Sequence, residues 1–328
     1  MVKFLARRLT WGIFTLWAVS VLTFVVMQLP PGDYADSYVQ QYQQNHPGAS
    51  NVDVEQVRHN LGLDKPAWQQ YWDWITGVLH GDFGLSLNQH RPVSEIISAD
   101  LGYTLLVAFL AVVVTWCIAL PLGAYSAVRR YSWLDYTVTF LSFVGLAIPT
   151  FLLALMLLYF SFDWLGWNAG GLFSPQYQSA SWSFGRLLNL GGHLVIPCLV
   201  LAAGGVANLS RVMRANLLDE LSKPYVITAQ AKGLPRRRLI TKYPLRVAMN
   251  PFASGIGLYI REVMSDTIIV SIILSLPTLG PTLVQSLRTQ DMLLAGAIIL
   301  LLGFVTIVGT LISDLVLVAL DPRIRHAG

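Results

Sequence analysis

The chain has 328 residues, of which 54% are hydrophobic and only 12% are charged. This composition, together with several long apolar runs, places the chain among polytopic membrane proteins. The formal net charge of +4 comes from Lys and Arg gathered in a few segments, and it does not indicate a nucleic-acid partner. The two cysteines, Cys117 and Cys198, lie in different apolar runs and predict neither a disulfide nor a metal site.

Six apolar runs are long enough to cross a bilayer, which takes about 20 residues for a hydrocarbon core of about 30 Å. Backbone groups inside a membrane must be satisfied within each segment, so we expect helices; the strands of a barrel would be shorter and alternating. The sequence therefore predicts an all-α polytopic protein with about six transmembrane helices. The runs cover residues 9–29, 103–127, 135–162, 193–217, 249–274 and 293–320.

Residues 1–29 are expected to hold a cytoplasmic N-terminal end and the first span. The apolar run is too long for a signal peptide and its exit, QLPPGD, has no small-x-small cleavage site, so we expect it to stay uncleaved. Residues 30–102 are then an extracytoplasmic segment, where VEQVRHNLGL and AWQQYWDWITGVL have helical spacing. The tryptophans of the second stretch indicate anchoring at the membrane interface or, alternatively, a ligand site.

Residues 103–328 are predicted to form a core domain with five further spans. Within it, Pro197 and Gly204-Gly205 interrupt the fourth apolar run. Outside the membrane, residues 163–192 are expected to form an irregular cap, and SLPTLGPTLVQSLRTQD predicts a re-entrant turn or a short helix.

The distribution of Lys and Arg predicts the orientation. With the N-terminus inside, sixteen of these residues fall in inner segments and five in outer ones. This asymmetry satisfies the positive-inside rule. Six spans then place both the N- and the C-terminus in the cytoplasm.

The polar segment 211–246, between the fourth and fifth runs, carries nine Lys and Arg against two acidic residues. Pro224 suits the first turn of a helix that runs to about Lys232, and Gly233 can take the left-handed conformation that ends it. The proline two residues later prevents continuation. A second, basic helix is expected from Arg236.

Two hypotheses concern the use of this segment. Small residues give the first helix a smooth face that another protein could approach closely, so residues 224–246 are predicted to be a docking element. Those residues are Thr228, Ala229, Ala231 and Gly233. The alternative is an amphipathic surface helix on anionic lipid, which RRRLITK alone would fit. The first helix does not fit that alternative, because it lacks a bulky apolar face.

The sequence contains no recognisable catalytic pattern. Its six histidines show no H-E-x-x-H or Cys/His spacing, and no G-x-x-x-x-G-K-[ST] sequence occurs. We therefore expect no catalytic residue, no metal site and no bound cofactor in this chain. If the protein moves a solute uphill, the energy comes from another polypeptide or from an ion gradient.

Three charged residues, Arg261, Glu262 and Asp266, lie within the fifth apolar run. A bare charge at the bilayer centre costs at least about 2.5–3.5 kcal/mol, so such residues usually face water or each other. Glu262 and Asp266 share a helical face, since they are four residues apart. Either the charges form a salt bridge between helices or with a partner subunit, or they line a path for a hydrophilic solute.

The segment TAQAKGL resembles the E-A-A-x-x-x-G loop of permease subunits of ATP-binding-cassette importers, and it keeps Ala229 and Gly233 at the family spacing without the acidic first residue. The wider resemblance is to the oligopeptide and dipeptide (peptide/opine/nickel) branch, and it covers nearly the whole chain. It rests on LARRL, LGLDKP, GDFGLSL, RPVSEII, YVITAQAKGLP, LRVAMNP, SLPTLG and DPRIR.

This resemblance implies the type I importer permease fold and a cytoplasmic coupling helix that fits a groove of an ATPase subunit. The implied coupling residues are Tyr225, Thr228, Ala229, Ala231, Lys232, Gly233, Leu234 and Pro235. It also implies partners: a second homologous permease, two ATP-binding subunits that bind ATP and Mg, and an extracytoplasmic substrate-binding protein. The chain would lie in the bacterial inner membrane.

The resemblance further implies that the fifth span lines the translocation path, through Arg261, Glu262, Asp266 and Ser271. The family tends to have small residues at the first three positions, and many relatives carry Glu at the fourth. The path would therefore be unusually polar. Peptide is the expected solute and oligosaccharide the alternative, because the same branch also carries oligosaccharides.

Two other classes of protein are disfavoured. An ion-coupled secondary transporter that uses Glu262 and Asp266 predicts inverted internal repeats with broken helices, and no such pairing is found. A membrane enzyme would need a catalytic constellation that the sequence lacks.

Overall fold

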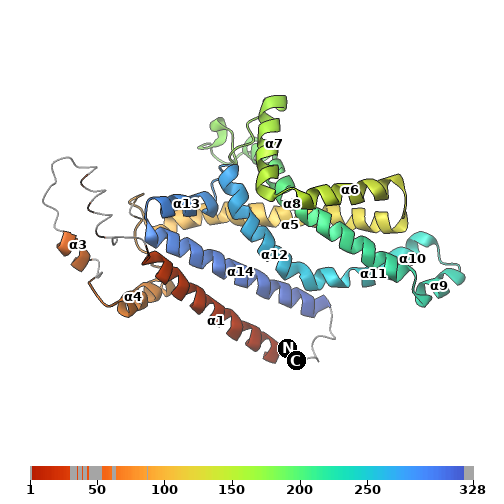
Figure 1. Ribbon diagram of the computed structural model, residues 1–328, viewed down its shortest axis with the longest axis horizontal. Coiled ribbons are helices and arrows are strands. Elements are labelled where there is room, and N and C mark those ends of the chain that lie inside the picture. The colour runs from red at the N-terminus through yellow and green to blue at the C-terminus, as the bar shows by residue number, and fades with distance from the viewer. Residues whose placement is uncertain are drawn as a thin grey trace. The chain divides into compact units, whose positions relative to one another are not determined.

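The computed structural model describes residues 2–29, 35, 39, 43, 54–60, 64–86 and 88–320. Helices dominate this part of the chain, and the one β-bridge found in it is an isolated antiparallel pair, Leu85 with Pro92 (Figure 1). The predicted all-α class is confirmed. In chain order the helices are α1 (Val2–Met27), α3 (Val54–Asn60), α4 (Ala67–Leu79), α5 (Val93–Val128), α6 (Trp133–Ala147), α7 (Thr150–Leu165), η1 (Pro175–Tyr177), α8 (Phe184–Leu221), α9 (Pro224–Ala231), α10 (Arg236–Lys242), α11 (Pro244–Ala248), α12 (Asn250–Ile273), α13 (Leu279–Arg288) and α14 (Met292–Leu320).

Within the described residues, four helices are long and apolar enough to cross a membrane: α5, α8, the Ala6–Met27 part of α1 and the Met292–Leu315 part of α14. The expected spans at 9–29, 103–127, 193–217 and 293–320 correspond to these helices. The helix over 249–274 is present as α12, but it is not among the helices apolar enough to span. Its membrane crossing stays a prediction.

The single helix expected over 135–162 is wrong. The structure has two helices there, α6 and α7, with a bend of 105° between them. Together they form either one broken span or a re-entrant loop. Pro149 explains the break, because a proline lacks the backbone N–H and pushes the preceding residue out of the helical conformation. Ile148 accordingly has φ −88° and ψ 120°, and helix resumes at Thr150.

The fourth expected span, unlike the third, is not broken at its proline. α8 runs without interruption through Pro197 and through Gly204-Gly205. Of the four candidate spans it is the most enclosed, with 56% of its apolar window buried inside the protein. Neighbouring helices can supply the groups that a proline leaves unsatisfied, so a packed helix tolerates one.

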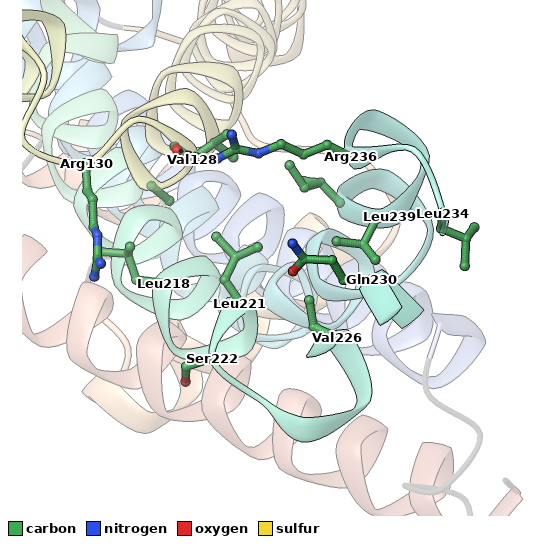
Figure 2. A pocket seen from close by; sticks show the side chains of 12 residues that line it. Val128, Arg130, Leu218, Leu221, Ser222, Val226, Gln230, Leu234, Arg236 and Leu239 are labelled. Atoms are coloured by element: carbon green, nitrogen blue, oxygen red, sulfur yellow. Dashed lines mark hydrogen bonds between the residues drawn. The ribbon is translucent and has the colours of Figure 1, made fainter. Parts of the chain in front are cut away.

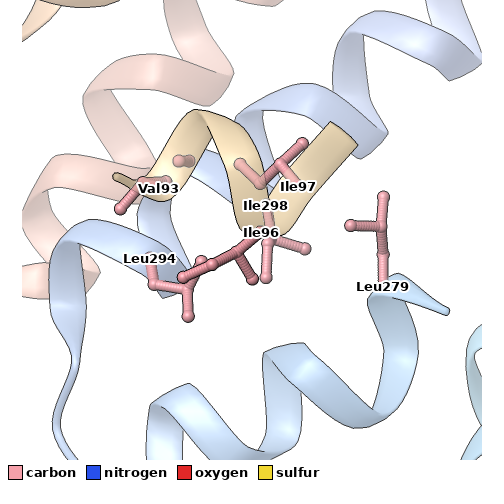
Figure 3. Packing of buried hydrophobic residues seen from close by; sticks show 7 residues of the cluster. Val93, Ile96, Ile97, Leu279, Leu294 and Ile298 are labelled. Atoms are coloured by element: carbon pink, nitrogen blue, oxygen red, sulfur yellow. The ribbon is translucent and has the colours of Figure 1, made fainter. Parts of the chain in front are cut away.

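The chain divides into two compact units, and the division falls within α5 and α14. One unit comprises Met1–Tyr103 and Thr278–Val308. Its core brings the start of α5 against α13 and α14 (Figure 3). The buried residues of this core are Val93, Ile96, Ile97, Leu279, Leu294, Ala297 and Ile298.

In the same unit, α4 packs on α1. The hydroxyls of Ser20 and Tyr71 are 2.8 Å apart, and the ring of Phe24 contacts those of Tyr71 and Trp74. Two other tryptophans of α4, Trp68 and Trp72, are exposed, as expected for interfacial anchors.

The second unit comprises Thr104–Pro277 and Gly309–Gly328. Here α6, α7, α11 and α12 all pack on α8, which is therefore the central helix of this unit. At its basic end, Met213 and Leu217 of α8 are buried with Ala127 of α5 and with residues of α11 and α12. This packing fixes the root of the polar segment that follows α8.

Candidate functional site: the helical knob after α8 and the polar face of α12

Residues 224–242 form two short helices directly after α8 (Figure 1). Pro224 is at the first position of α9, and Lys232 ends that helix. Gly233 has φ +78°, the left-handed conformation that favours glycine, and Pro235 precedes α10. The predicted helix, turn and second helix are all confirmed. We call α9, α10 and the turn between them the knob.

The knob has a small core of its own. Val226 and Ala229 of α9 are buried against Leu239 of α10, and Leu234 and Tyr243 pack on this cluster. Ala229 is only 9% exposed, so it is a core residue and not part of the smooth outer face on which the sequence placed it. The reason is helical geometry: positions three apart lie on one face, and Val226 already points inward.

The other small residues of the first helix do lie on the surface. Thr228, Ala231, Lys232 and Gly233 are exposed, as is Pro235. The turn and the end of α9 therefore offer a surface with short side chains and one positive charge, Lys232, while the exposed basic residues of α10 lie beyond it.

Ile227 is a surface residue that the sequence analysis missed. Its side chain is 61% exposed, next to the small residues of the same helix. The signal was present in the pattern, because α9 buries positions 226 and 229 and leaves 227 on the outside. An exposed apolar side chain is stabilised when a partner protein covers it, because its surface is removed from water.

Tyr225 links the knob to the end of α8. Its hydroxyl donates to Glu220 Oε2 at 2.5 Å. Partial burial, and then this hydrogen bond, raises the pKa of Tyr225 to about 12, so the phenol keeps its proton at physiological pH. Lys223, just before α9, pairs with Asp219 at 3.1 Å. These contacts join the first turn of the knob to the last turn of α8.

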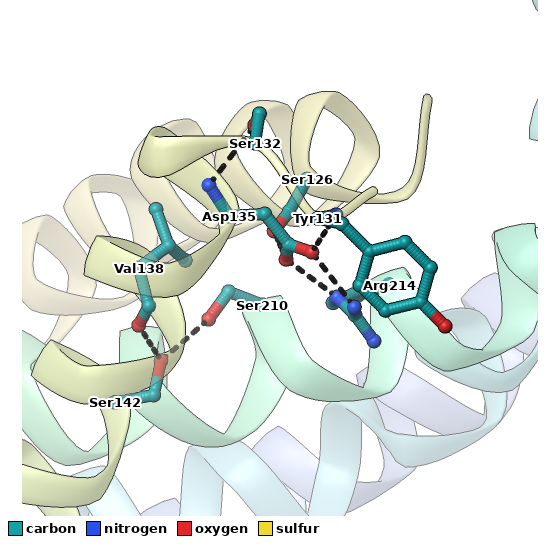
Figure 4. A network of polar contacts seen from close by, with 8 residues as sticks. All are labelled: Ser126, Tyr131, Ser132, Asp135, Val138, Ser142, Ser210 and Arg214. Carbon is teal, nitrogen blue, oxygen red and sulfur yellow. Dashed lines mark hydrogen bonds and ion pairs between the residues drawn. The ribbon is translucent and has the colours of Figure 1, made fainter. Parts of the chain in front are cut away.

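Two turns before its end, α8 is clamped to α5 and α6 (Figure 4). Arg214 donates from Nε and Nη2 to the two carboxylate oxygens of Asp135, at 2.7 and 2.8 Å. Ser126 Oγ and the backbone N–H of Tyr131 also donate to this carboxylate. The Asp135 carboxylate is buried and accepts four hydrogen bonds, two of them from Arg214, and this ion pair was not predicted from the sequence.

Two signals in the sequence point to this clamp. Asp135 is the sole acidic residue between positions 101 and 162, and a lone buried acid needs a cation. Ser132 and Asp135 also have the spacing of a helix N-cap, and the N–H of Asp135 does donate to Ser132 Oγ. The identity of the cation was not readable, because Arg214 lies far along the chain among other basic residues.

The polar residues of α12 have different surroundings. Arg261 and Glu262 are exposed and, within the described part of the chain, neither forms an ion pair or a hydrogen bond. Asp266 is half-buried and accepts a hydrogen bond from Thr150 Oγ1 at 3.3 Å. A salt bridge among the helices of this chain therefore finds no support for Arg261 and Glu262.

Ser271 lies five residues beyond Asp266 on the same helix. It is 1% exposed, and its hydroxyl has no hydrogen-bond partner among the described residues. A buried hydroxyl without a partner is uncommon and costs free energy. No group of three or more His, Cys, Asp or Glu in the described ranges could hold a metal ion.

Two families match the chain. Residues 119–326 match the family described as "Binding-protein-dependent transport system inner membrane component". Residues 1–108 match "Binding-prot-dependent transport system membrane comp, N-term".

Similar proteins cover the chain from end to end. The Oligopeptide transport system permease protein AppB of Bacillus subtilis (strain 168) is 34% identical over 328 residues, 99% of this chain and 100% of the relative. The Dipeptide transport system permease protein DppB of Escherichia coli (strain K12) is 32% identical over 342 residues, 99% of each chain. The Glutathione transport system permease protein GsiC of the same strain is 32% identical over 326 residues, 99% of this chain and 100% of the relative.

Helices able to span a membrane, the family match over most of the chain and relatives matched along their full length agree with one another. The chain belongs to the inner membrane components of binding-protein-dependent transport systems, as a multi-pass permease subunit of the type I ATP-binding-cassette importer fold.

Proposed function

We propose that the chain forms, with a second homologous permease, the path of a peptide importer, and that separate ATPase subunits drive it through the knob. The observation that carries this proposal is the knob itself. It is a self-packed helix pair at the end of the central helix α8, and its first helix exposes short side chains with Ile227 among them. Such a surface fits a groove of a partner protein.

The knob can transmit force because its root is fixed. A push on α9 acts on the end of α8 through the hydrogen bond from Tyr225 to Glu220. Arg214 then holds α8 to α6 through Asp135, and α6 leads into α7, which also packs on α8. A movement of the knob would therefore tilt α8 together with α6 and α7, since no flexible loop separates the knob from α8.

The coupling set in this proposal keeps the residues expected from the sequence. Tyr225, Thr228, Ala231, Lys232, Gly233 and Pro235 form the exposed part. Ala229 and Leu234 support it from within. ATP and Mg would be bound by the partner subunits, since this sequence has no phosphate-binding loop of the G-x-x-x-x-G-K-[ST] kind.

The orientation in this proposal follows from charge. The knob and both termini lie in the cytoplasm, and residues 30–102 lie outside, where a substrate-binding protein delivers the solute. In this proposal residues 1–29 hold the cytoplasmic N-terminal end and the first span, and residues 103–328 form the core permease domain with five further spans.

A peptide is the proposed solute. Arg261, Glu262 and Asp266 put both signs of charge on α12, and the first two are exposed without an ion-pair partner among the described residues. A free peptide is a zwitterion, so its carboxylate and its ammonium group each find an opposite charge there. The named activities of the relatives, which concern oligopeptide, dipeptide and glutathione transport, favour the same choice. A neutral oligosaccharide would leave these charges without partners.

Copurification tests the subunit role. A tagged chain should retain a homologous permease and ATPase subunits in fixed stoichiometry, and vesicles that hold this chain alone should not transport. Uptake by the chain alone would contradict the proposal.

Competition tests the solute. Uptake of a labelled dipeptide should be inhibited by unlabelled dipeptide, weakly by the same peptide with its termini acetylated and amidated, and not by an oligosaccharide. If the blocked peptide inhibited uptake as strongly as the free dipeptide, the terminal charges would not contribute to recognition.

A further inference from the structure

A pocket of about 590 Å³ lies between the knob and the ends of α5 and α8 (Figure 2). Its walls come from the last turns of α5 and α8 and from both helices of the knob. A pocket of this size falls within the range of about 300–1,000 Å³ that small ligands occupy.

The pocket lies where two spanning helices end. Val128 is the last residue of α5 and Leu221 the last residue of α8, and both line the pocket. Apolar spans end where the hydrocarbon core of a membrane gives way to lipid headgroups. The apolar run of α5 ends at the pocket, which places Val128 at the depth of the headgroups, whereas the last turns of α8 that line the pocket belong to the polar segment 211–246.

The charge of the pocket is positive. Arg130 and Arg236 are among its lining residues, and no Asp or Glu is. Arg236 reaches from α10 to the end of α5, where its Nη2 donates to the carbonyl of Val128 at 3.4 Å. Arg130 follows α5 by two residues, and its guanidinium lies beside Leu218, while that of Arg236 lies beside Val128 (Figure 2).

The two positive charges have no counter-charge within the described part of the chain. Neither Arg130 nor Arg236 forms an ion pair there; the guanidinium of Arg130 lies 5.8 Å from the ring centre of Tyr131. The nearby acids are engaged elsewhere, because Asp219 pairs with Lys223 and Glu220 accepts from Tyr225. A guanidinium presents a planar fork of donors that matches a phosphate group.

Apolar side chains complete the pocket. Leu218 and Leu221 of α8 line it, as does Val226 of the knob. A free phosphate ion would make no use of these side chains. A ligand with an anionic head and an apolar body would use both the arginines and the leucines.

We propose that this pocket binds an anionic phospholipid of the cytoplasmic leaflet, with its anionic headgroup between Arg130 and Arg236 and its glycerol backbone and first acyl carbons against Leu218 and Leu221. The inference goes beyond the transport role and shares with it only the cytoplasmic placement of the knob. A lipid held there bridges α5, α8 and α10, so it would stiffen the root through which the knob acts.

The test uses the purified complex of this chain with its partner permease and ATPase subunits in a neutral detergent. The complex is titrated with dioctanoyl phosphatidylglycerol, and retained lipid is counted by native mass spectrometry. We expect one saturable site that prefers phosphatidylglycerol to phosphatidylcholine. Arg130→Gln and Arg236→Gln should each weaken the affinity about tenfold, since a hydrogen bond to a charged group has this effect.

The chain offers matched controls in Arg129 and Arg237. Each is an exposed arginine next to a pocket arginine, and neither lines the pocket. Arg129→Gln and Arg237→Gln remove the same charge and should change the affinity less than about threefold. Arg130→Lys keeps the charge but loses the planar fork of donors. The affinity of this variant for the lipid should therefore lie between that of the unchanged complex and that of Arg130→Gln.

Several results would overturn the proposal. Equal losses in all four glutamine variants would mean diffuse attraction to a basic surface. Displacement of the lipid by millimolar inorganic phosphate would assign the site to a soluble anion. A complex that retains no phosphatidylglycerol would mean that another subunit covers the pocket. None of these results would contradict the proposed transport role, which is tested separately by peptide uptake.

Discussion

The knob and α12 are the two polar regions that stand out in an apolar sequence, and they satisfy their polar groups in different ways. The knob packs Val226, Ala229 and Leu239 into its own core and joins α8 through Tyr225. α12 leaves Arg261 and Glu262 exposed, with no ion-pair partner in the described residues. The core of the knob is thus complete within this chain, whereas the charges of α12 are left open to solvent, a solute or another subunit.

The difference shows which features of the fold local interactions determine and which they do not. Helix ends and turns depend on residues a few positions apart, so the knob folds as its sequence indicates. A charge within an apolar helix depends on what faces it, which can be another chain altogether. Four predictions test this contrast, from the largest expected effect to the smallest.

Breaking the clamp beneath the knob should have the largest effect. Asp135→Asn leaves Arg214 without its buried counter-charge and should lower the free energy of unfolding by about 3 kcal/mol. Chemical unfolding of the purified protein measures this loss. The double variant Asp135→Asn with Arg214→Gln should recover part of it, because no unpaired charge remains. A single variant as stable as the parent would mean that the pair does not hold α8.

A change at Gly233 should uncouple the knob without disturbing the rest. A Cβ atom at Gly233 would meet nothing within 4 Å, so the φ of +78° is the feature that opposes substitution. Gly233→Val should therefore strain the turn by about 1–2 kcal/mol and abolish substrate-stimulated ATPase activity of the complex.

Gly233→Asn is the matched control, because asparagine tolerates the left-handed conformation and should retain most of that activity. The comparison separates backbone shape from surface contact. If valine and asparagine behave alike, the conformation of this turn is not what the partner reads.

Neutralising α12 should change selectivity while leaving the fold intact. Glu262→Gln combined with Asp266→Asn removes the negative charges of the helix. The KM for a dipeptide with a free amino group should rise about tenfold, and that for an N-acetylated dipeptide should change little. Uptake kinetics for the two peptides give the answer. Unchanged kinetics for both would assign these residues to a contact with the partner subunit.

Ile227 should show the smallest effect. Ile227→Ser removes an exposed apolar side chain from the outer face of α9 and should weaken binding of the ATPase subunit about fivefold, since burial of an isoleucine contributes about 1.5–3 kcal/mol at most. Titration of the permease complex with the purified ATPase subunit measures the affinity. Val247→Ser is the control, because Val247 is also exposed but lies on α11, outside the knob. Equal effects of the two changes would remove Ile227 from the proposed interface.

Much of the fold was predictable from the sequence. Long apolar runs identify α1, α5, α8 and α14, because the composition of about 20 successive residues decides whether a helix suits a membrane. The turn of the knob was predictable as well, since Pro224, Gly233 and Pro235 act through their own φ angles and their own missing or present N–H groups.

The sequence alone determined where polar and apolar segments alternate and how the chain turns at the knob. Only the tertiary structure decided that Pro149 breaks a helix while Pro197 does not, and that Ala229 points inward. It alone decided that Asp135 pairs with Arg214, 79 positions away. The physical reason is that these outcomes depend on neighbours brought together by packing: a proline is tolerated where other helices surround it, and a buried charge is stable only beside its partner.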